Sequence, residues 1–109
     1  MEKELYEIHA DICKVLSNPT RLEILNLLRD GEMSVTELIK KTKLNQANIS
    51  QHLSIMKSKW IVISTRKGKN INYKIKNPKI IKAFDIIRGV LAERLNEDNR
   101  IANKFRSKK

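Results

Sequence analysis

This chain has little of what marks a secreted, membrane-spanning or catalytic protein. A single cysteine among 109 residues excludes an intrachain disulfide and fits a reducing cytosol. No N-terminal apolar run resembles a signal peptide, and no stretch is long enough to span a bilayer. No nucleophile-plus-base set, glycine-rich phosphate loop or carboxylate pair is visible. We therefore expect a cytoplasmic protein without membrane contact, cofactor or enzymatic activity.

Acidic residues are missing from the middle of the chain. None occurs between Leu38 and Phe84, whereas twelve basic residues lie in that stretch, which leaves 11 basic and 12 acidic residues elsewhere. The formal net charge of +11 is therefore concentrated in one segment. A solubilising surface normally mixes both signs, so a segment of one sign indicates binding to a polyanion. We expect double-stranded DNA as the partner.

The stretch from Ser34 to Lys59 predicts two helices joined by a tight turn. Ser34 and Glu37 form a capping box, in which each side chain accepts a hydrogen bond from the backbone N–H of the other. Asn45 is a good N-cap for the second helix. A short helix, a brief turn and a longer helix are the outline of a helix-turn-helix.

The second of these helices has two unlike faces. Ile49, Leu53 and Met56 follow helical spacing and are expected to turn inward. The other face carries amides and hydroxyls, which can hydrogen-bond to base edges in a major groove, where a merely solvated face would more usually carry Glu and Lys. The alternative is an exposed face that only reflects biased composition. We predict base contacts from Gln46, Asn48, Ser50 and Gln51.

A β-hairpin with a basic tip is predicted after this helix. Ile61 to Arg66 is rich in β-branched residues, and Ile71 to Ile75 alternates in polarity across an intervening turn. Beside a recognition helix, such a hairpin forms a wing that can lie along the phosphate backbone or in the minor groove. For His52, a phosphate contact and a hydrogen bond within the protein both stay open. We predict phosphate contacts from Lys43, Ser54, Lys57, Arg66, Lys67 and Lys69.

Amphipathic helices flank this central part, from Lys3 to Leu16 and from Asn77-Pro78 to about Leu95, and Asn18-Pro19 begins a further helix that runs to about Asp30. The terminal helices carry more apolar surface than one domain covers, which predicts a two-fold dimer. The alternative is that the last helix only covers its own domain. The predicted dimer interface consists of Leu5, Ile8, Ile12, Phe84, Ile87 and Leu91.

The predicted fold is mainly α with a small β-hairpin, in the order helix, helix, short strand, helix, helix, strand, strand, helix. We expect one winged-helix DNA-binding and dimerisation domain over residues 1–97 and a basic tail over residues 98–109. His9 and Cys13 lie one turn apart on the first helix, so both could face the dimer interface with ligand or redox chemistry. The alternative is that Cys13 packs as a small hydrophobe and His9 lies on the rim.

The chain resembles the arsenic-repressor-like (ArsR/SmtB) family of winged-helix transcriptional regulators from about Ile8 to Leu95. The segments that carry the resemblance are Asn18-Pro19-Thr20-Arg21-Leu22, residues 44–53, Gly68-Lys69 and Tyr73-Lys74-Ile75. The resemblance implies a homodimer built from the terminal helices, which binds an inverted-repeat operator and usually represses. In this family, effector binding normally lowers DNA affinity.

The metal-sensing sites of the family do not carry over. Ser34 and Thr36 stand where the first site would have thiolates, and soft metals are held by thiolates rather than by neutral hydroxyls. The positions that match the second site hold one possible ligand: Asn77, Lys79, Val90 and Glu93. We expect no metal site, and the sequence does not identify an effector. Trp60 stands where many relatives have glycine, and we expect its ring to pack under the wing.

We therefore predict a sequence-specific, dimeric, DNA-binding transcriptional regulator that acts as a repressor. One alternative is an architectural protein that coats DNA with little sequence preference, since the basic segment favours it equally. Another is a winged-helix module that contacts only proteins, which the basic helix and wing argue against.

Overall fold

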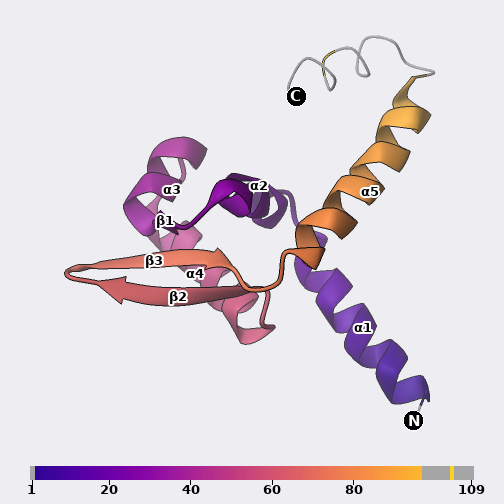
Figure 1. Ribbon diagram of the computed structural model, residues 1–109, viewed down its shortest axis with the longest axis horizontal. Helices are drawn as coiled ribbons and strands as arrows, with labels where there is room; N and C mark the ends of the chain where they lie inside the picture. Colours follow the sequence, from indigo (N-terminus) through magenta and orange to yellow (C-terminus); the bar gives the residue numbers. More distant parts are fainter. Residues whose placement is uncertain (1, 97–103, 105–109) are drawn as a thin grey trace. The chain divides into compact units, whose positions relative to one another are not determined.

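The computed structural model describes residues 2–96 and Lys104, and it confirms a mainly helical chain with a small antiparallel sheet (Figure 1). The elements are, in order, α1 (Glu2–Leu16), α2 (Pro19–Leu27), the 3₁₀ turn η1 (Leu28–Asp30), β1 (Met33–Ser34), α3 (Val35–Thr42), α4 (Gln46–Ser58), β2 (Val62–Lys67), β3 (Asn70–Ile75) and α5 (Lys79–Leu95). This is the predicted order. The first helix and the two wing strands differ by one residue at their ends from the predicted ranges, and the last turn of the second helix is tightened into η1.

The chain divides into two compact units, Met1–Pro78 and Lys79–Lys109. The first unit contains the helix-turn-helix and the wing, and the second contains α5. Apart from Lys104, the predicted basic tail lies outside the described residues. The assignment of residues 1–97 to a single domain stays a prediction.

Side chains identified from the sequence start three of the helices. Asn18 accepts a hydrogen bond from the backbone N–H three residues on (3.2 Å), with Pro19 in the first position of α2. At the start of α3, the Ser34 hydroxyl accepts from the Glu37 N–H (3.1 Å), and the Glu37 carboxylate accepts from the Ser34 N–H (3.0 Å). Asn45 caps α4 with a 2.8 Å bond. Each cap satisfies an N–H that the first helical turn leaves without a partner.

The core of the first unit lies between α2, α3, α4 and the start of β2. Its fully buried side chains come from these elements and from the residue just before β2: Ile24, Leu25, Leu38, Ile49, Leu53, Met56, Ile61 and Val62. The inward face predicted for α4 is therefore confirmed. It fixes which face of that helix is left to solvent.

The sheet holds the wing against the start of the helix-turn-helix. Its strand order is β1-β3-β2, with both pairs antiparallel, and Ser34 at the start of α3 lies opposite Asn72. β2 and β3 pair over six residues and turn at Gly68 and Lys69. Gly68 has a φ of 65°, which glycine adopts at no steric cost and which a two-residue hairpin loop of this kind requires.

The prediction that Trp60 packs under the wing is wrong. Its side chain is 74% exposed, with the Lys76 ammonium 4.5 Å from the ring centroid. Trp60 has a φ of 63°, a left-handed conformation that glycine adopts freely. The two residues that follow, Ile61 and Val62, fill the core at this point, so no space is left beneath the strand for the ring.

Candidate nucleic-acid interface

The solvent face of α4 presents short polar side chains. Gln46, Ser50 and Gln51 are exposed, and Asn48, whose backbone N–H donates to the Asn45 side chain, is half-buried. All four lie in the first two turns of the helix. Opposite them, Ile49, Leu53 and Met56 are fully buried, so this polar face has one fixed orientation on the domain. That these residues contact bases stays a prediction.

Exposed cations precede α4, lie in its last turn and follow it on the wing. Lys43 ends α3 in a left-handed conformation with a φ of 63°, and the wing carries its cations near the hairpin loop. All residues predicted to contact phosphate are exposed: Lys43, Ser54, Lys57, Arg66, Lys67 and Lys69. The arrangement suits a phosphate backbone that passes on each side of α4. The individual contacts stay predictions.

Two acids from outside the acid-free segment reach its lysines. The Lys59 ammonium lies 2.9 Å from an Asp11 carboxylate oxygen, which joins α1 to the end of α4. Glu32 accepts hydrogen bonds from Lys67 and, at 3.1 Å, from Asn72. The hydrogen bond from Lys67, followed by that from Asn72, lowers the pKa of Glu32, and the hydrogen bond and charge of Lys59 lower the pKa of Asp11. Both carboxylates are therefore ionised at neutral pH.

Sequence patterns did not indicate these two pairs, since the partners lie 48 and 35 residues apart. No local spacing rule joins residues at such separations. The strand pairing is the one signal that could have indicated the second pair. Once β1 is paired with β3, a residue just before β1 must lie near the wing. Charge counted along the chain therefore overstates the charge that the wing presents.

Of the two alternatives for His52, the structure shows the hydrogen bond within the protein. Arg21 Nε donates to His52 Nδ1 at 3.2 Å, and Arg21 Nη1 donates to the Val15 carbonyl at 2.9 Å. Burial, and secondly the charge of Arg21, lower the pKa of His52. His52 is therefore neutral at pH 7 and accepts through Nδ1. The contact ties α4 to α2 and to the last turn of α1.

The terminal helices each leave apolar side chains uncovered. On α1, Leu5 and Ile8 are exposed and Ile12 is half-buried. These side chains are available for a contact that a single chain does not make. His9 and Cys13 are also exposed, so Cys13 does not pack as a buried hydrophobe in the chain alone.

Within α5, Ile87 and Leu91 are exposed, and Phe84 is half-buried with the Arg88 guanidinium 5.6 Å from its ring. No residue of α5 is buried. An amphipathic helix with an uncovered apolar face needs a partner surface. Contact of these residues with a second subunit was predicted from the sequence and stays a prediction.

Nothing in the described residues assembles a metal site. They contain no group of three or more His, Cys, Asp or Glu placed to hold an ion. The Ser34 hydroxyl, at a family thiolate position, is buried and accepts the Glu37 N–H. Among the same residues, no helix combines the length and hydrophobicity needed to cross a membrane.

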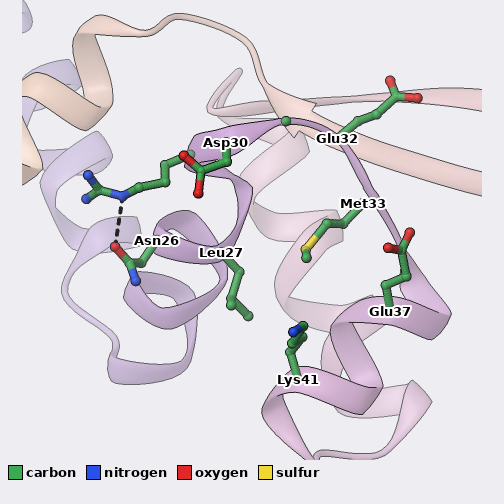
Figure 2. Close-up of a pocket in the computed structure, with 9 residues that line it drawn as sticks. Asn26, Leu27, Asp30, Glu32, Met33, Glu37 and Lys41 are labelled. Carbon is green, nitrogen blue, oxygen red and sulfur yellow. Dashed lines mark hydrogen bonds between the residues drawn. The ribbon is translucent and has the colours of Figure 1, made fainter. Parts of the chain in front are cut away.

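A pocket of about 400 Å³ lies where the end of α2 meets the start of α3 (Figure 2). Its lining is of mixed charge, with Asp30, Glu32 and Glu37 beside Arg29 and Lys41. Two of the three carboxylates already have partners, since Glu37 caps α3 and Glu32 bonds to the wing. Its described lining includes none of the residues predicted to contact DNA.

Comparison with known proteins places the chain among transcriptional regulators. A family model described as "Bacterial regulatory protein, arsR family" matches residues 18–63. An uncharacterised HTH-type transcriptional regulator of Mycobacterium tuberculosis is 35% identical over 99 residues, which cover 89% of this chain and 87% of the relative. The crystal structure of that regulator has a TM-score of 0.79 at 34% identity and covers 86% of this chain and 95% of its own.

Two further relatives bear on the mode of action. The transcriptional repressor PagR of Bacillus anthracis is 39% identical over 75 residues, which cover 68% of this chain and 75% of the relative. The solution structure of a homodimeric winged helix-turn-helix DNA-binding domain from Mycobacterium bovis has a TM-score of 0.80 at 30% identity, and covers 88% of this chain and 89% of its own. These relatives favour the regulator and lend no support to the architectural alternative.

Proposed function

Since the chain belongs to the ArsR family of bacterial regulatory proteins, and so is a DNA-binding regulator of transcription, we propose that it works as a homodimeric repressor of a two-fold operator. The observation that carries the proposal is α4. Its apolar face is fully buried, its polar face is mostly exposed, and exposed cations precede and follow it in the chain. A helix of this kind fits a major groove, where amides and hydroxyls can read base edges.

Base reading falls to the first two turns of α4. The amides of Gln46, Asn48 and Gln51 can each form two hydrogen bonds with adenine, and the Ser50 hydroxyl can form a single hydrogen bond with a base edge. Lys57, Arg66 and Lys69 then hold the phosphate backbone without regard to sequence. In a two-fold dimer, the two α4 helices would enter grooves about one helical turn apart.

Dimerisation accounts for the uncovered apolar side chains of the terminal helices. Ile8 of α1 and Ile87 of α5 are exposed in the single chain and would be covered by a second copy. The homodimeric relative from Mycobacterium bovis supports this part of the proposal. Repression is supported by the family and by PagR, which is named as a repressor. The cytoplasm, where the DNA lies, is the proposed compartment.

Signal detection would not use a thiolate metal site. Ser34 offers a neutral hydroxyl that is already engaged in capping α3, and Thr36 offers another neutral oxygen. A soft metal would gain too little from such ligands to displace the cap. The proposed regulator therefore differs from metal-sensing relatives in how it is released from DNA.

Selection of bound genomic fragments followed by footprinting tests the proposal. A discrete, palindromic protected site is expected, and uniform coverage would support DNA coating instead. Gln51→Ala should then reduce the preference for that site over a mixed-sequence duplex. Lys69→Gln should weaken binding to both duplexes and reduce the salt slope by about one.

Lys3→Gln, at an exposed lysine on α1, is the matched control and should change neither quantity. Equal losses on the two duplexes for both Gln51→Ala and Lys69→Gln would contradict the division between base reading and phosphate binding.

A further inference from the structure

Glu32 joins all three strands of the sheet. Glu32 directly precedes β1. Its carboxylate accepts hydrogen bonds from Asn72 of β3, at 3.1 Å, and from Lys67 at the end of β2. Because Lys67 lies opposite Asn70, beside the hairpin loop, the bond reaches the outer end of the wing. One side chain thus contacts both strands in the outer half of the hairpin.

This carboxylate lies within a surface that otherwise carries positive charge. No acidic residue belongs to β2, β3 or their loop, whereas Arg66, Lys67, Lys69 and Lys74 do. The Glu32 side chain is only 29% exposed, while that of Lys67 is 58% exposed. Glu32 is therefore held by two hydrogen bonds, and Lys67 is the more accessible member of the pair.

We propose that Glu32 is a positioning residue that limits DNA binding, because it competes with phosphate for Lys67. The inference rests on the proposed function and goes beyond it, by assigning a role to an acid outside the recognition helix and wing. In the free protein, the Glu32 carboxylate offsets the charge of Lys67. Near DNA, the same carboxylate repels phosphate.

The competing explanation is an ordinary surface ion pair that only supports the fold. Such pairs contribute little and have no consequence for a ligand elsewhere. The two explanations differ in the dependence of DNA affinity on salt, which counts the cations released when lysines contact phosphate. A purely structural pair would leave that slope unchanged when its charge is removed.

Glu32→Gln is the decisive variant. Glutamine keeps the size of the side chain and an oxygen that can accept from Asn72, but it does not hold Lys67 by charge. Binding to a mixed-sequence duplex is expected to tighten about 3- to 10-fold at low salt, with a slope steeper by up to about one. Glu7→Gln, at an exposed acid of α1, controls for the change in net charge and should leave both quantities unchanged.

Lys67→Gln in both backgrounds completes the test. It should reduce DNA affinity less in the wild-type protein than in the Glu32→Gln protein, where it should abolish the gain, which shows that the gain passes through Lys67. Lys69 pairs with no acid among the described residues, so Lys69→Gln should cost the same in both backgrounds. Equal costs of Lys67→Gln in the two backgrounds, or a gain with Glu7→Gln, overturn the inference.

Two outcomes separate this inference from the function on which it rests. If the wild-type protein binds DNA and the Glu32→Gln protein binds it equally well or more weakly, only the inference is overturned. Failure of the wild-type chain to bind any duplex overturns the proposed function, and the inference with it. If Glu32→Gln does not fold, the wild-type background decides: a smaller loss for Lys67→Gln than for Lys69→Gln supports the competition, and equal losses overturn it.

Discussion

Replacing Ile87 by alanine is expected to dissociate the proposed dimer while leaving each chain folded. The Ile87 side chain is 69% exposed in the single chain. Full burial of an isoleucine contributes about 1.5–3 kcal/mol, so covering this exposed part would contribute about 1–2 kcal/mol. The side chain occurs twice in a two-fold interface, which brings the loss to about 2–4 kcal/mol per dimer. At 1.4 kcal/mol for each tenfold, the dimer dissociation constant should rise about 30- to 700-fold.

Sedimentation velocity over a range of protein concentrations measures this constant directly. The matched control is Ile71→Ala, since Ile71 is 44% exposed but lies on the wing, away from the predicted interface residues in sequence. Thermal unfolding of both variants establishes that the fold is retained. The reasoning is refuted if Ile87→Ala dimerises as tightly as the wild type, or if Ile71→Ala weakens the dimer equally.

Three further predictions concern the helix-turn-helix. Asn45→Ala removes the 2.8 Å cap of α4 and should cost about 1 kcal/mol, lowering Tm by about 4–8 °C, whereas Asn45→Ser should restore most of the loss. The pKa of His52 lies below its usual 6.5 in the folded chain, so the unfolded chain binds the proton more readily. The contribution of His52 to the free energy of unfolding should be fully present above pH 6.5 and should decrease as the pH drops below it. His52→Gln should flatten that part of a pH-dependent melting curve, and an unchanged curve would exclude His52 as its cause. Lys43→Gly removes the strain of the left-handed backbone and should raise the free energy of unfolding by up to about 1 kcal/mol while weakening DNA binding. A variant that is more stable and binds DNA as tightly as the wild type, or more tightly, would contradict a DNA-binding role for Lys43.

Features that depend on neighbouring residues were predictable from the sequence. The caps at Asn18, Ser34 and Asn45 each act over three residues, and the hairpin between β2 and β3 turns at a glycine flanked by basic residues. The inward face of α4 follows from helical spacing alone. Because the signals for these elements are local, the amino-acid sequence predicts both the element order and the polar face of α4.

Features that depend on distant residues were not predictable in the same way. Arg21 and His52 are 31 residues apart, and no periodicity indicates that they meet. The prediction for Trp60 was wrong for a different reason. A large apolar ring next to an apolar strand is normally assigned to the core. Its left-handed backbone and the burial of the two residues after it left the ring outside. The candidate site was therefore predicted in its composition, but not in its internal ion pairs.

The first helix is tied to the recognition helix by polar contacts at two levels. Asp11 holds Lys59 beyond the end of α4, and Arg21 bridges the Val15 carbonyl in the last turn of α1 to His52 in the middle of α4. The buried side chains of α4 fix its orientation, and these two polar contacts connect that helix to α1. Since α1 also carries predicted dimer residues, a second copy bound to α1 would set the direction of the base-reading face.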